Sequence, residues 1–396
     1  MIMNITDKRD SRYTNHSYKE LLSQRILQIA CNYEDANDSN ILRKDPALKA
    51  ACGRLPNGSD LGSQPTITRL ENAPRRTDLY RLGLAFIDNF IDSYNIPPKG
   101  IIVDLDDTCD PTHGHQQLSL FNNYYDEFCY MPLHIYEGSS GKLIATVLRP
   151  GKCAKGAEVV AIVKRVIRQI KHHWPEVEII VRGDSHFSVP QLHSWCGANG
   201  IHYVLGQMGN AILKKLSTSL VEQAKELYTQ EKKKVRLFKS VMYQAVSWEN
   251  PQRIVMKAEI TEKGVNTRFV VTSFESSQAS FIYDTVYCGR GCMENYIKEH
   301  KTHLHSDRTS CSHFAANQLR LFLHGAAYVL MHTFREIGLK GTTLARAQFN
   351  TIQNKILKIG TRVEEMVTKV RFHFPTNFPF KDIIRSITGN LSSVMT

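Results

Sequence analysis

Two hydrophobic segments that end in acidic residues decide how this chain folds. Residues 100–108 have the sequence GIIVDLDDT, and residues 178–185 have the sequence EIIVRGDS. Each begins with the β-branched apolar run of a buried strand and ends in Asp. Side chains alternate along a strand, so Asp104 and Asp106 should face one side of the first segment and Asp107 the other. We therefore expect two strands that each carry carboxylates at their C-terminal end.

The segments around these two strands alternate in pattern. YDEFCYMPLHIYEG (125–138), KLIATVLRPG (142–151) and HYVLGQM (202–208) each indicate a further strand. Apolar residues recur at helical spacing over 157–170, and a short helix should begin at Pro190. The order of three strands, helix, strand, helix and strand predicts an α/β fold, in which helical crossovers add parallel strands to a hairpin-fed sheet.

Helical patterns dominate the rest of the chain. They occur at 18–30, 79–94, 281–304 and 315–335, while a Lys-rich helical pattern at 211–233 leads into three strand patterns. We divide the chain into a helical region (1–98), the first part of the core (99–209), a β-rich insertion (210–275), the last part of the core (276–339) and a basic C-terminal region (340–396).

The chain is strongly basic. Its 396 residues carry 50 Lys and Arg against 38 Asp and Glu, a formal net charge of +12. Residues 340–396 alone have a net charge of +6, and Lys232–Lys239 form a second basic run. An excess of this size favours a polyanionic partner through phosphate neutralisation, the alternative being a basic protein without one.

Cysteine spacing and apolar runs indicate a cytosolic protein. The nine cysteines are scattered and do not form paired C-x-x-C motifs, which argues against a zinc ribbon or a disulfide framework. The N-terminal segment lacks the apolar stretch of a signal peptide. The longest apolar run, Leu321–Met331, is too short to span a bilayer.

The acidic strand ends need positive charge nearby. Two carboxylates on one side of a strand repel each other, and a divalent cation would relieve that repulsion, since open sheets bind ligands at strand ends. A turn at Asp110-Pro111 is the alternative for the first strand, and a helix N-cap is the alternative for Asp184.

A third segment, YCGRGCMENYIKEHK (287–301), carries another acidic residue. At about 100° per residue, four of its side chains fall within an arc of about 60° on one helical face. They are those of Tyr287, Arg290, Glu294 and Lys301. The glycines beside the Arg favour a helix that starts after the Tyr. An exposed stripe with one Arg–Glu pair is the alternative.

The pattern Tyr-x2-Arg-x3-Glu-x6-Lys, with Asp at the ends of two earlier strands, resembles the signature of bacterial insertion-sequence transposases of the DDE class. This resemblance implies a ribonuclease H-like core with a β-strand insertion, preceded by a helical DNA-binding region. It also implies metal-dependent cleavage and joining of DNA at the ends of a mobile element, in the bacterial cytoplasm beside the nucleoid. Further resemblance covers LLSQRILQIACNYEDANDSNILRKDPALKAACGR, SQPTITRLEN, DPTHGHQQ, YYDEFCYMPLHIY, LRPGK, VRGDSHF and DRTSCSHFAANQLRLFLHGAAYVL.

The resemblance assigns the catalytic acids. The first Asp of the family precedes a small or polar residue and Thr, which matches Asp106, with Asp104 as a close second. Asp184 and Glu294 would be the other two acids. Together Asp106, Asp184 and Glu294 would hold two Mg²⁺ or Mn²⁺ ions about 3.5–4 Å apart, since oxygen ligands suit these metals.

The resemblance also implies DNA contacts. Arg290 and Lys301 would clamp phosphates, and Tyr287 would contact the DNA backbone. The partners would be double-stranded DNA, both terminal inverted repeats and target, and further copies of the chain in a homodimer or larger assembly on that DNA.

Residues 63–71, SQPTITRLE, resemble the start of a recognition helix. Ser63 would be the N-cap, Pro65 would lie in the first turn, and Thr66 and Arg69 would face outward toward DNA. An ordinary packing helix is the alternative.

Two other functions remain open. Family members usually carry several dozen more residues before the segment near Ser17, so we expect this chain to be an N-terminally truncated or late-starting copy. The first alternative to an active transposase is therefore a relic that binds DNA without cutting it. Asp104-x-Asp106-x-Thr108 also looks like the first motif of haloacid-dehalogenase-type phosphatases, with Asp104 as nucleophile. That family has a second Asp about four residues after its later Gly-Asp, where this chain has Ser188.

Overall fold

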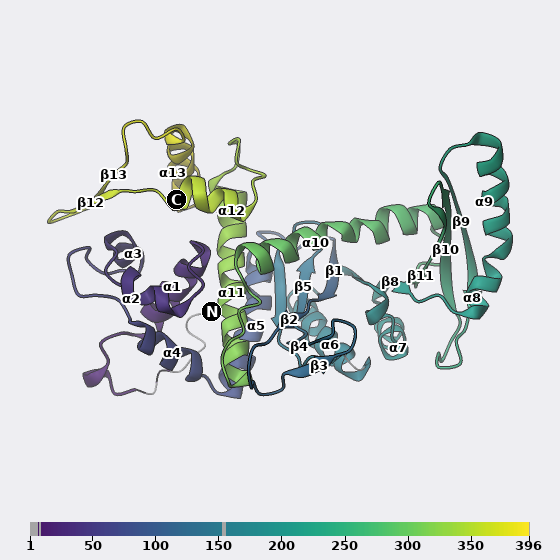
Figure 1. Cartoon of the computed structure of the whole chain (residues 1–396), viewed down its shortest axis with the longest axis horizontal. Coiled ribbons are helices and arrows are strands. Elements are labelled where there is room, and N and C mark those ends of the chain that lie inside the picture. Colours follow the sequence, from purple (N-terminus) through teal and green to yellow (C-terminus); the bar gives the residue numbers. More distant parts are fainter. Residues whose placement is uncertain (1–6, 8, 153–155, 396) are drawn as a thin grey trace.

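The computed structural model of the chain describes residue 7, residues 9–152 and residues 156–395. Its centre is one eight-stranded sheet with the strand order β6-β5-β1-β7-β8-β11-β10-β9 (Figure 1). β1, β5 and β6 pair antiparallel, whereas β7 and β8 continue the sheet parallel to β1. These five strands are β1 (Gly100–Asp107), β5 (Leu133–Glu137), β6 (Leu143–Val147), β7 (Glu178–Gly183) and β8 (His202–Gln207).

Helices cover both faces of the sheet. On one face, α5 (Arg76–Asp92), α6 and α7 share a core with the odd-numbered apolar side chains of β1, such as Val103 and Leu105, while α9 (Thr218–Glu231) packs against β9 and β10. Alternation then sends Asp104 and Asp106 to the opposite face, where the helical run of residues 281–303 crosses the sheet. The two crossover helices are α6 (Gly156–His173), predicted from helical periodicity, and α7 (Pro190–Ala198), which begins at the predicted Pro190.

The predicted β-rich insertion forms strands but is not a separate sheet. β9 (Val235–Tyr243), β10 (Gln252–Thr261) and β11 (Gly264–Thr272) extend the central sheet, because β11 pairs with β8. The Lys-rich helix predicted before them is two helices, α8 (Ala211–Leu216) and α9 (Thr218–Glu231), and the Ser217 hydroxyl donates to a carbonyl of α8 where they meet.

The N-terminal helices share a core with a late segment of the chain. α11 (Phe314–Thr333) is buried along most of its length and packs against α1, α4, α5 and β6. It contains the longest apolar run of the sequence, and Figure 1 shows it between α1–α4 on one side and the sheet on the other. In the part of the chain that the structure describes, no helix is long and apolar enough to cross a membrane. The N-terminal helices are α1 (Tyr18–Ala30), α2 (Ser39–Leu42), α3 (Pro46–Ala51), α4 (Gln64–Asn72) and α5 (Arg76–Asp92).

The strand predicted over 125–138 is two strands. It breaks before Pro132, which lacks a backbone N–H and so cannot donate to a ladder at that position. β5 joins the central sheet, and β4 forms a small second sheet in the order β2-β4-β3. The strands of this small sheet are β2 (Asp110–Pro111), β3 (Leu120–Asn122) and β4 (Glu127–Tyr130).

The described part of the C-terminal region contains a hairpin and two α-helices, the first of which continues into a π-helix at Gln353–Leu357. These are α12 (Phe349–Ile352), β12 (Arg362–Glu365), β13 (Val370–His373) and α13 (Lys381–Met395). The eight cysteines that the structure describes are free thiols, and Cys153 lies outside the described residues.

Histidine rings are buried between the sheet and the helices. His134, on β5, is 1% exposed and its ring centroid lies 4.8 Å from that of His300. Its Nδ1 lies 3.1 Å from the Thr146 hydroxyl. Burial lowers the pKa of His134 from 6.5 to about 3, with a smaller contribution from Lys301. The folded chain therefore holds this ring neutral.

We expect His134 to make the fold acid-labile. Because its pKa is lower in the folded chain, the stability it contributes is complete above about pH 6.5 and falls as the pH drops toward 3. At pH 5 the loss should be about 2 kcal/mol. In urea unfolding, the free energy of unfolding should fall less between pH 8 and pH 5 for His134→Asn than for wild type. His172→Asn, at an exposed position, should show the same fall as wild type. An equal pH difference in His134→Asn and wild type would contradict this prediction.

Candidate active site

One helical run crosses the acidic face of the sheet. Residues 281–287 and 299–303 are π-helical, 288–290 form a 3-10 turn, and α10 (Gly291–Lys298) lies between them. Tyr287 therefore lies inside the run, not before it as predicted. The glycine that suggested a break has another role: a Cβ on Gly289 would lie 2.8 Å from Nη1 of Arg182, so glycine permits the close approach of the run to the sheet.

Asp106 lies at the C-terminal end of β1 in a poorly solvated position. Its side chain is 15% exposed, and its Oδ1 is 2.8 Å from Nη2 of Arg290. Burial raises its carboxyl pKa to about 7. Arg290 opposes this shift, and the nearby Asp184 and Asp107 add to it. The ionised form of Asp106 is therefore poorly stabilised, because water is partly excluded and two other carboxylates are nearby.

Asp184 follows β7, the parallel neighbour of β1. It caps the turn after the strand, because its Oδ1 accepts a hydrogen bond from the His186 backbone N–H at 2.9 Å. The N-cap alternative for Asp184 is therefore correct as a description of its local structure. Because Leu105 of β1 pairs with Gly183 of β7, the residues that follow them, Asp106 and Asp184, lie at adjacent strand ends.

Glu294 lies on α10 and is exposed. It lines an open cavity of about 480 Å³ together with Asp106, Tyr125 and Lys301. Asp184 lines a second cavity, of about 840 Å³, together with Tyr287. Among the residues that the structure describes, no group of three or more His, Cys, Asp and Glu is close enough to hold a metal ion as it stands.

Asp104 is separated from this cavity. It lies two residues earlier on the same face of β1, where its Cα pairs with that of Arg182 on β7. The Asp104 side chain has 0% exposure and accepts two hydrogen bonds from the Arg182 guanidinium, at 2.5 and 2.6 Å. A carboxylate enclosed in this way is not available as the nucleophile of a phosphatase.

The remaining signature residues lie along the helical run. Tyr287 is partly buried, and burial raises the pKa of its hydroxyl. Lys301 donates a hydrogen bond to the Cys109 carbonyl and lies 3.7 Å from Oδ1 of Asp110. Lys301 thus contacts the segment that follows β1, and Arg290 contacts the end of β1 itself.

Sequence reasoning gave no role to three residues that contact the acids. Arg149 donates to Oδ2 of Asp107 at 2.6 Å, and Nδ1 of His186 lies 3.6 Å from Oδ2 of Asp184. Arg182 holds Asp104. All three lie in the quoted motifs LRPGK and VRGDSHF. Basic residues in these motifs were therefore the sequence feature that could have identified partners for the acidic residues.

The proposed recognition helix, α4, begins where predicted. Ser63 precedes it, but the Ser63 hydroxyl lies 3.2 Å from the Thr66 hydroxyl and does not bond a backbone amide. Thr66 is half-buried and Arg69 is exposed, while Ile67 and Leu70 are buried. α4 therefore packs on one side and presents Arg69 on the other.

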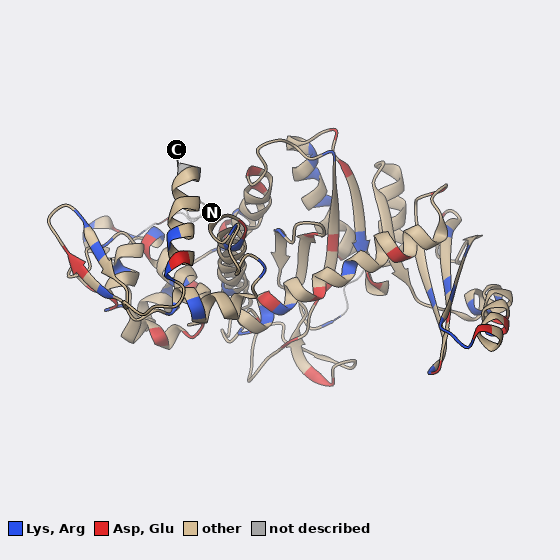
Figure 2. Cartoon of the chain, turned by 90° about the horizontal axis from the view of Figure 1, so that it is seen from above, with Lys and Arg blue, Asp and Glu red and all other residues tan. Residues whose placement is uncertain are grey.

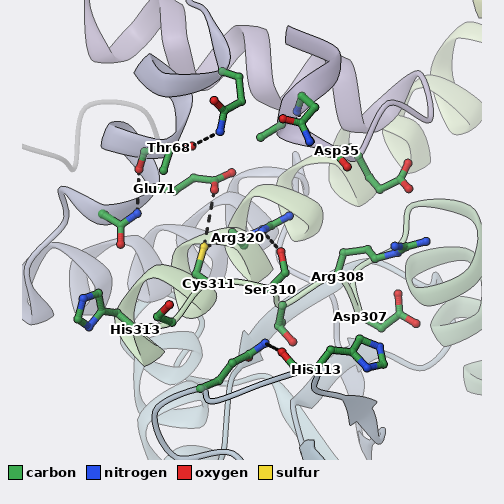
Figure 3. Close-up of a pocket in the computed structure, with 18 of the residues that line it drawn as sticks. Asp35, Thr68, Glu71, His113, Asp307, Arg308, Ser310, Cys311, His313 and Arg320 are labelled. Atoms are coloured by element: carbon green, nitrogen blue, oxygen red, sulfur yellow. Dashed lines mark hydrogen bonds between the residues drawn. The ribbon is translucent and has the colours of Figure 1, made fainter. Parts of the chain in front are cut away.

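A polar cavity of about 800 Å³ lies beside α4. Thr68 and Glu71 of α4 face Ser310, Cys311 and Arg320 across it (Figure 3). The Arg320 guanidinium donates to the Ser310 hydroxyl at 2.6 Å. This cavity contains none of the three acids assigned to the active site.

The chain matches the family model described as "Transposase DDE domain group 1" over residues 2–396. It therefore belongs to this family of DDE transposases, and DNA transposition is the function that the family implies. A search among curated proteins found no match. Among solved structures, a cryo-EM structure of the piggyBac transposase synaptic complex with hairpin DNA matches with a TM-score of 0.45 and 10% identity, covering 88% of this chain and 73% of that chain. That similarity is too low to support an inference about this chain.

Proposed function

We propose that this protein is a DNA transposase that binds the ends of its element and catalyses metal-dependent DNA strand cleavage and strand transfer. The observation that carries the proposal is that Asp106 and Asp184 lie at the ends of neighbouring parallel strands, and that Asp106 lines one cavity together with Glu294 of α10. Three antiparallel strands followed by two parallel ones support a ribonuclease H-like core.

The donor set fits a hard divalent cation. Asp106, Asp184 and Glu294 offer only oxygen atoms, which suit Mg²⁺ or Mn²⁺. Burial is the main cause of the raised pKa of Asp106, so a bound cation would stabilise the charged form of this carboxyl group. Two bound ions would activate the attacking oxygen and neutralise the leaving oxygen of an in-line displacement. Arg290, 2.8 Å from Asp106, is in place to contact a phosphate oxygen bound beside that carboxylate.

Basic residues near Asp184 support a DNA path. Lys214, Lys225 and Arg268 line the same cavity as Asp184 and Tyr287 and are exposed. The basic run at 232–239 is less available to bind DNA phosphates, because Lys234 and Arg236 both pair with Glu259. Lys and Arg are otherwise spread along the whole chain (Figure 2). We propose Arg69, Thr66, Tyr287, Arg290 and Lys301 as further DNA contacts.

The biological setting follows from the same proposal. The chain would act in the bacterial cytoplasm as the transposase of an insertion sequence. Its DNA partners would be the terminal inverted repeats of the element and the target duplex. Joining two ends requires two active sites, so we propose a homodimer or a larger assembly on the DNA.

Asp184→Asn is expected to keep DNA-end binding and to lose cleavage, because the amide preserves shape but removes the charge of a metal ligand. The substrate is a labelled duplex taken from the DNA that flanks the coding sequence, with Mn²⁺ present. Asp92→Asn, at the exposed end of α5, is the matched control. If Asp184→Asn cuts as fast as wild type, the acidic assignment is wrong. Binding without any cleavage by wild type would instead support the DNA-binding relic.

A further inference from the structure

An aromatic hairpin stands beside the acidic cavity. β3 and β4 belong to the small β2-β4-β3 sheet, whose labels lie below the helical run in Figure 1. Residues 123–126 connect the two strands, and Tyr125 in that turn lines the cavity that also contains Asp106 and Glu294. The hairpin is therefore continuous with the proposed active site.

The two faces of this hairpin differ. Cys129 and Asn122 are buried on the inner face, and the Asn122 amide donates to the Gly151 carbonyl at 3.0 Å. On the outer face, Phe121 and Phe128 are direct cross-strand partners with side chains 43% and 57% exposed. Their ring centroids are 5.4 Å apart. Two Phe rings are thus held together on the open side of a hairpin that is anchored by its other side.

The turn adds two Tyr rings. Tyr124 is 81% exposed and Tyr125 is 39% exposed, and their centroids lie 4.9 Å apart. The Tyr124 backbone N–H donates to Oδ1 of Asn122 at 3.0 Å, which orders the turn. Four aromatic rings within one short hairpin form an exposed patch of the kind that marks a binding surface.

We propose that Phe121, Tyr124, Tyr125 and Phe128 form a stacking surface for unpaired nucleobases of the DNA strand whose phosphodiester lies at Asp106 and Glu294. This inference rests on the proposed function. Aromatic rings stack on any base, because every base has a π-face. Asp126, exposed in the turn beside these rings, repels phosphates, so the hairpin suits bases and leaves the DNA backbone to the basic residues near Asp184.

The surface would act by favouring an opened DNA end over a paired one. Bases in an intact duplex are stacked on each other and do not present their faces to a protein. A ring that replaces this stacking offsets part of the cost of unpairing. The hairpin would thereby hold the strand that enters the cavity while leaving the paired part of the end unaffected.

The test compares two labelled duplexes of the same element end without metal, one fully paired and one with three unpaired nucleotides at the cleavage position. Tyr124→Ala/Phe128→Ala is expected to lose about tenfold in affinity for the unpaired duplex and less than twofold for the paired one. Tyr124→Phe and Phe128→Tyr, which keep the rings, should bind as wild type. A 2-aminopurine at an unpaired position should be quenched by wild type and not by the double Ala variant.

Three results would overturn the inference: equal affinity losses for both duplexes, no preference of wild type for the unpaired duplex, or unchanged quenching in the double Ala variant. A change in sedimentation alone would assign the rings to contact with a second copy of the chain. Asp184→Asn separates this inference from the catalytic proposal, because it should quench 2-aminopurine like wild type while failing to cleave. Quenching by a wild type that never cleaves would leave the stacking surface standing and the catalytic proposal refuted.

Discussion

Asp106→Asn is expected to lower the rate of DNA cleavage by about three orders of magnitude or more while leaving the folded chain at least as stable as wild type. A thousandfold loss corresponds to about 4 kcal/mol of transition-state stabilisation, which is reasonable for removing a charged metal ligand. Stability should not fall, because burial raises the carboxyl pKa to about 7. At pH 8 the folded chain therefore carries a carboxylate that would be better solvated after unfolding, and a neutral amide removes that penalty.

Two measurements at pH 8 check this prediction: the initial rate of cleavage with Mn²⁺, and the free energy of unfolding in urea without metal. Glu294→Gln is the matched comparison, since Glu294 lines the same cavity but is exposed, so its amide variant should lose cleavage with little change in stability. Cleavage by Asp106→Asn at the wild-type rate would remove Asp106 from the site. A large loss of stability would show that its carboxylate is structural.

Local patterns predicted much of the core. The bounds of α1 agree with the predicted segment 18–30, and α6 buries the residues whose spacing predicted it, including Val159 and Val166. The approach of Asp106 to Asp184 was also accessible from sequence, because the C-terminal ends of neighbouring parallel strands meet at one edge of a sheet.

Long-range contacts account for what the sequence left undetermined. Alternation placed Asp104 and Asp106 on the same face and could not distinguish them, because the difference lies in Arg182, a residue 78 positions later in the chain. The position of Tyr287 was missed because Gly289 suggests a helix break, whereas its lack of a side chain makes room for the Arg182 guanidinium. The pairing of β11 with β8 leaves no local pattern, so the insertion could not be recognised as an extension of the same sheet.

The ion pair between Asp104 and Arg182 joins the three elements that carry the proposed acids. Asp104 precedes Asp106 by two residues on β1, and Arg182 precedes Asp184 by two residues on β7. The Arg182 Nη1 also donates to the Val286 carbonyl, at 2.6 Å, in the helical run that leads to α10. The pair therefore fixes the two strand ends and the helical run relative to one another.

Asp104→Leu and Arg182→Met are each expected to lower the free energy of unfolding by about 3–5 kcal/mol, because each leaves a buried charged partner uncompensated. The double variant Asp104→Leu/Arg182→Met should regain much of that loss, since neither charge remains. It should still cleave DNA more slowly than wild type, because nothing then holds the Val286 carbonyl. Urea unfolding and cleavage rates of wild type, the two single variants and the double variant check this. As a control, Asp382→Asn breaks the exposed pair with Arg385 and should lower the free energy of unfolding by no more than about 1 kcal/mol. Additive losses in the double variant would mean that the two side chains act independently, and a double variant with wild-type cleavage would leave the pair a role in stability alone.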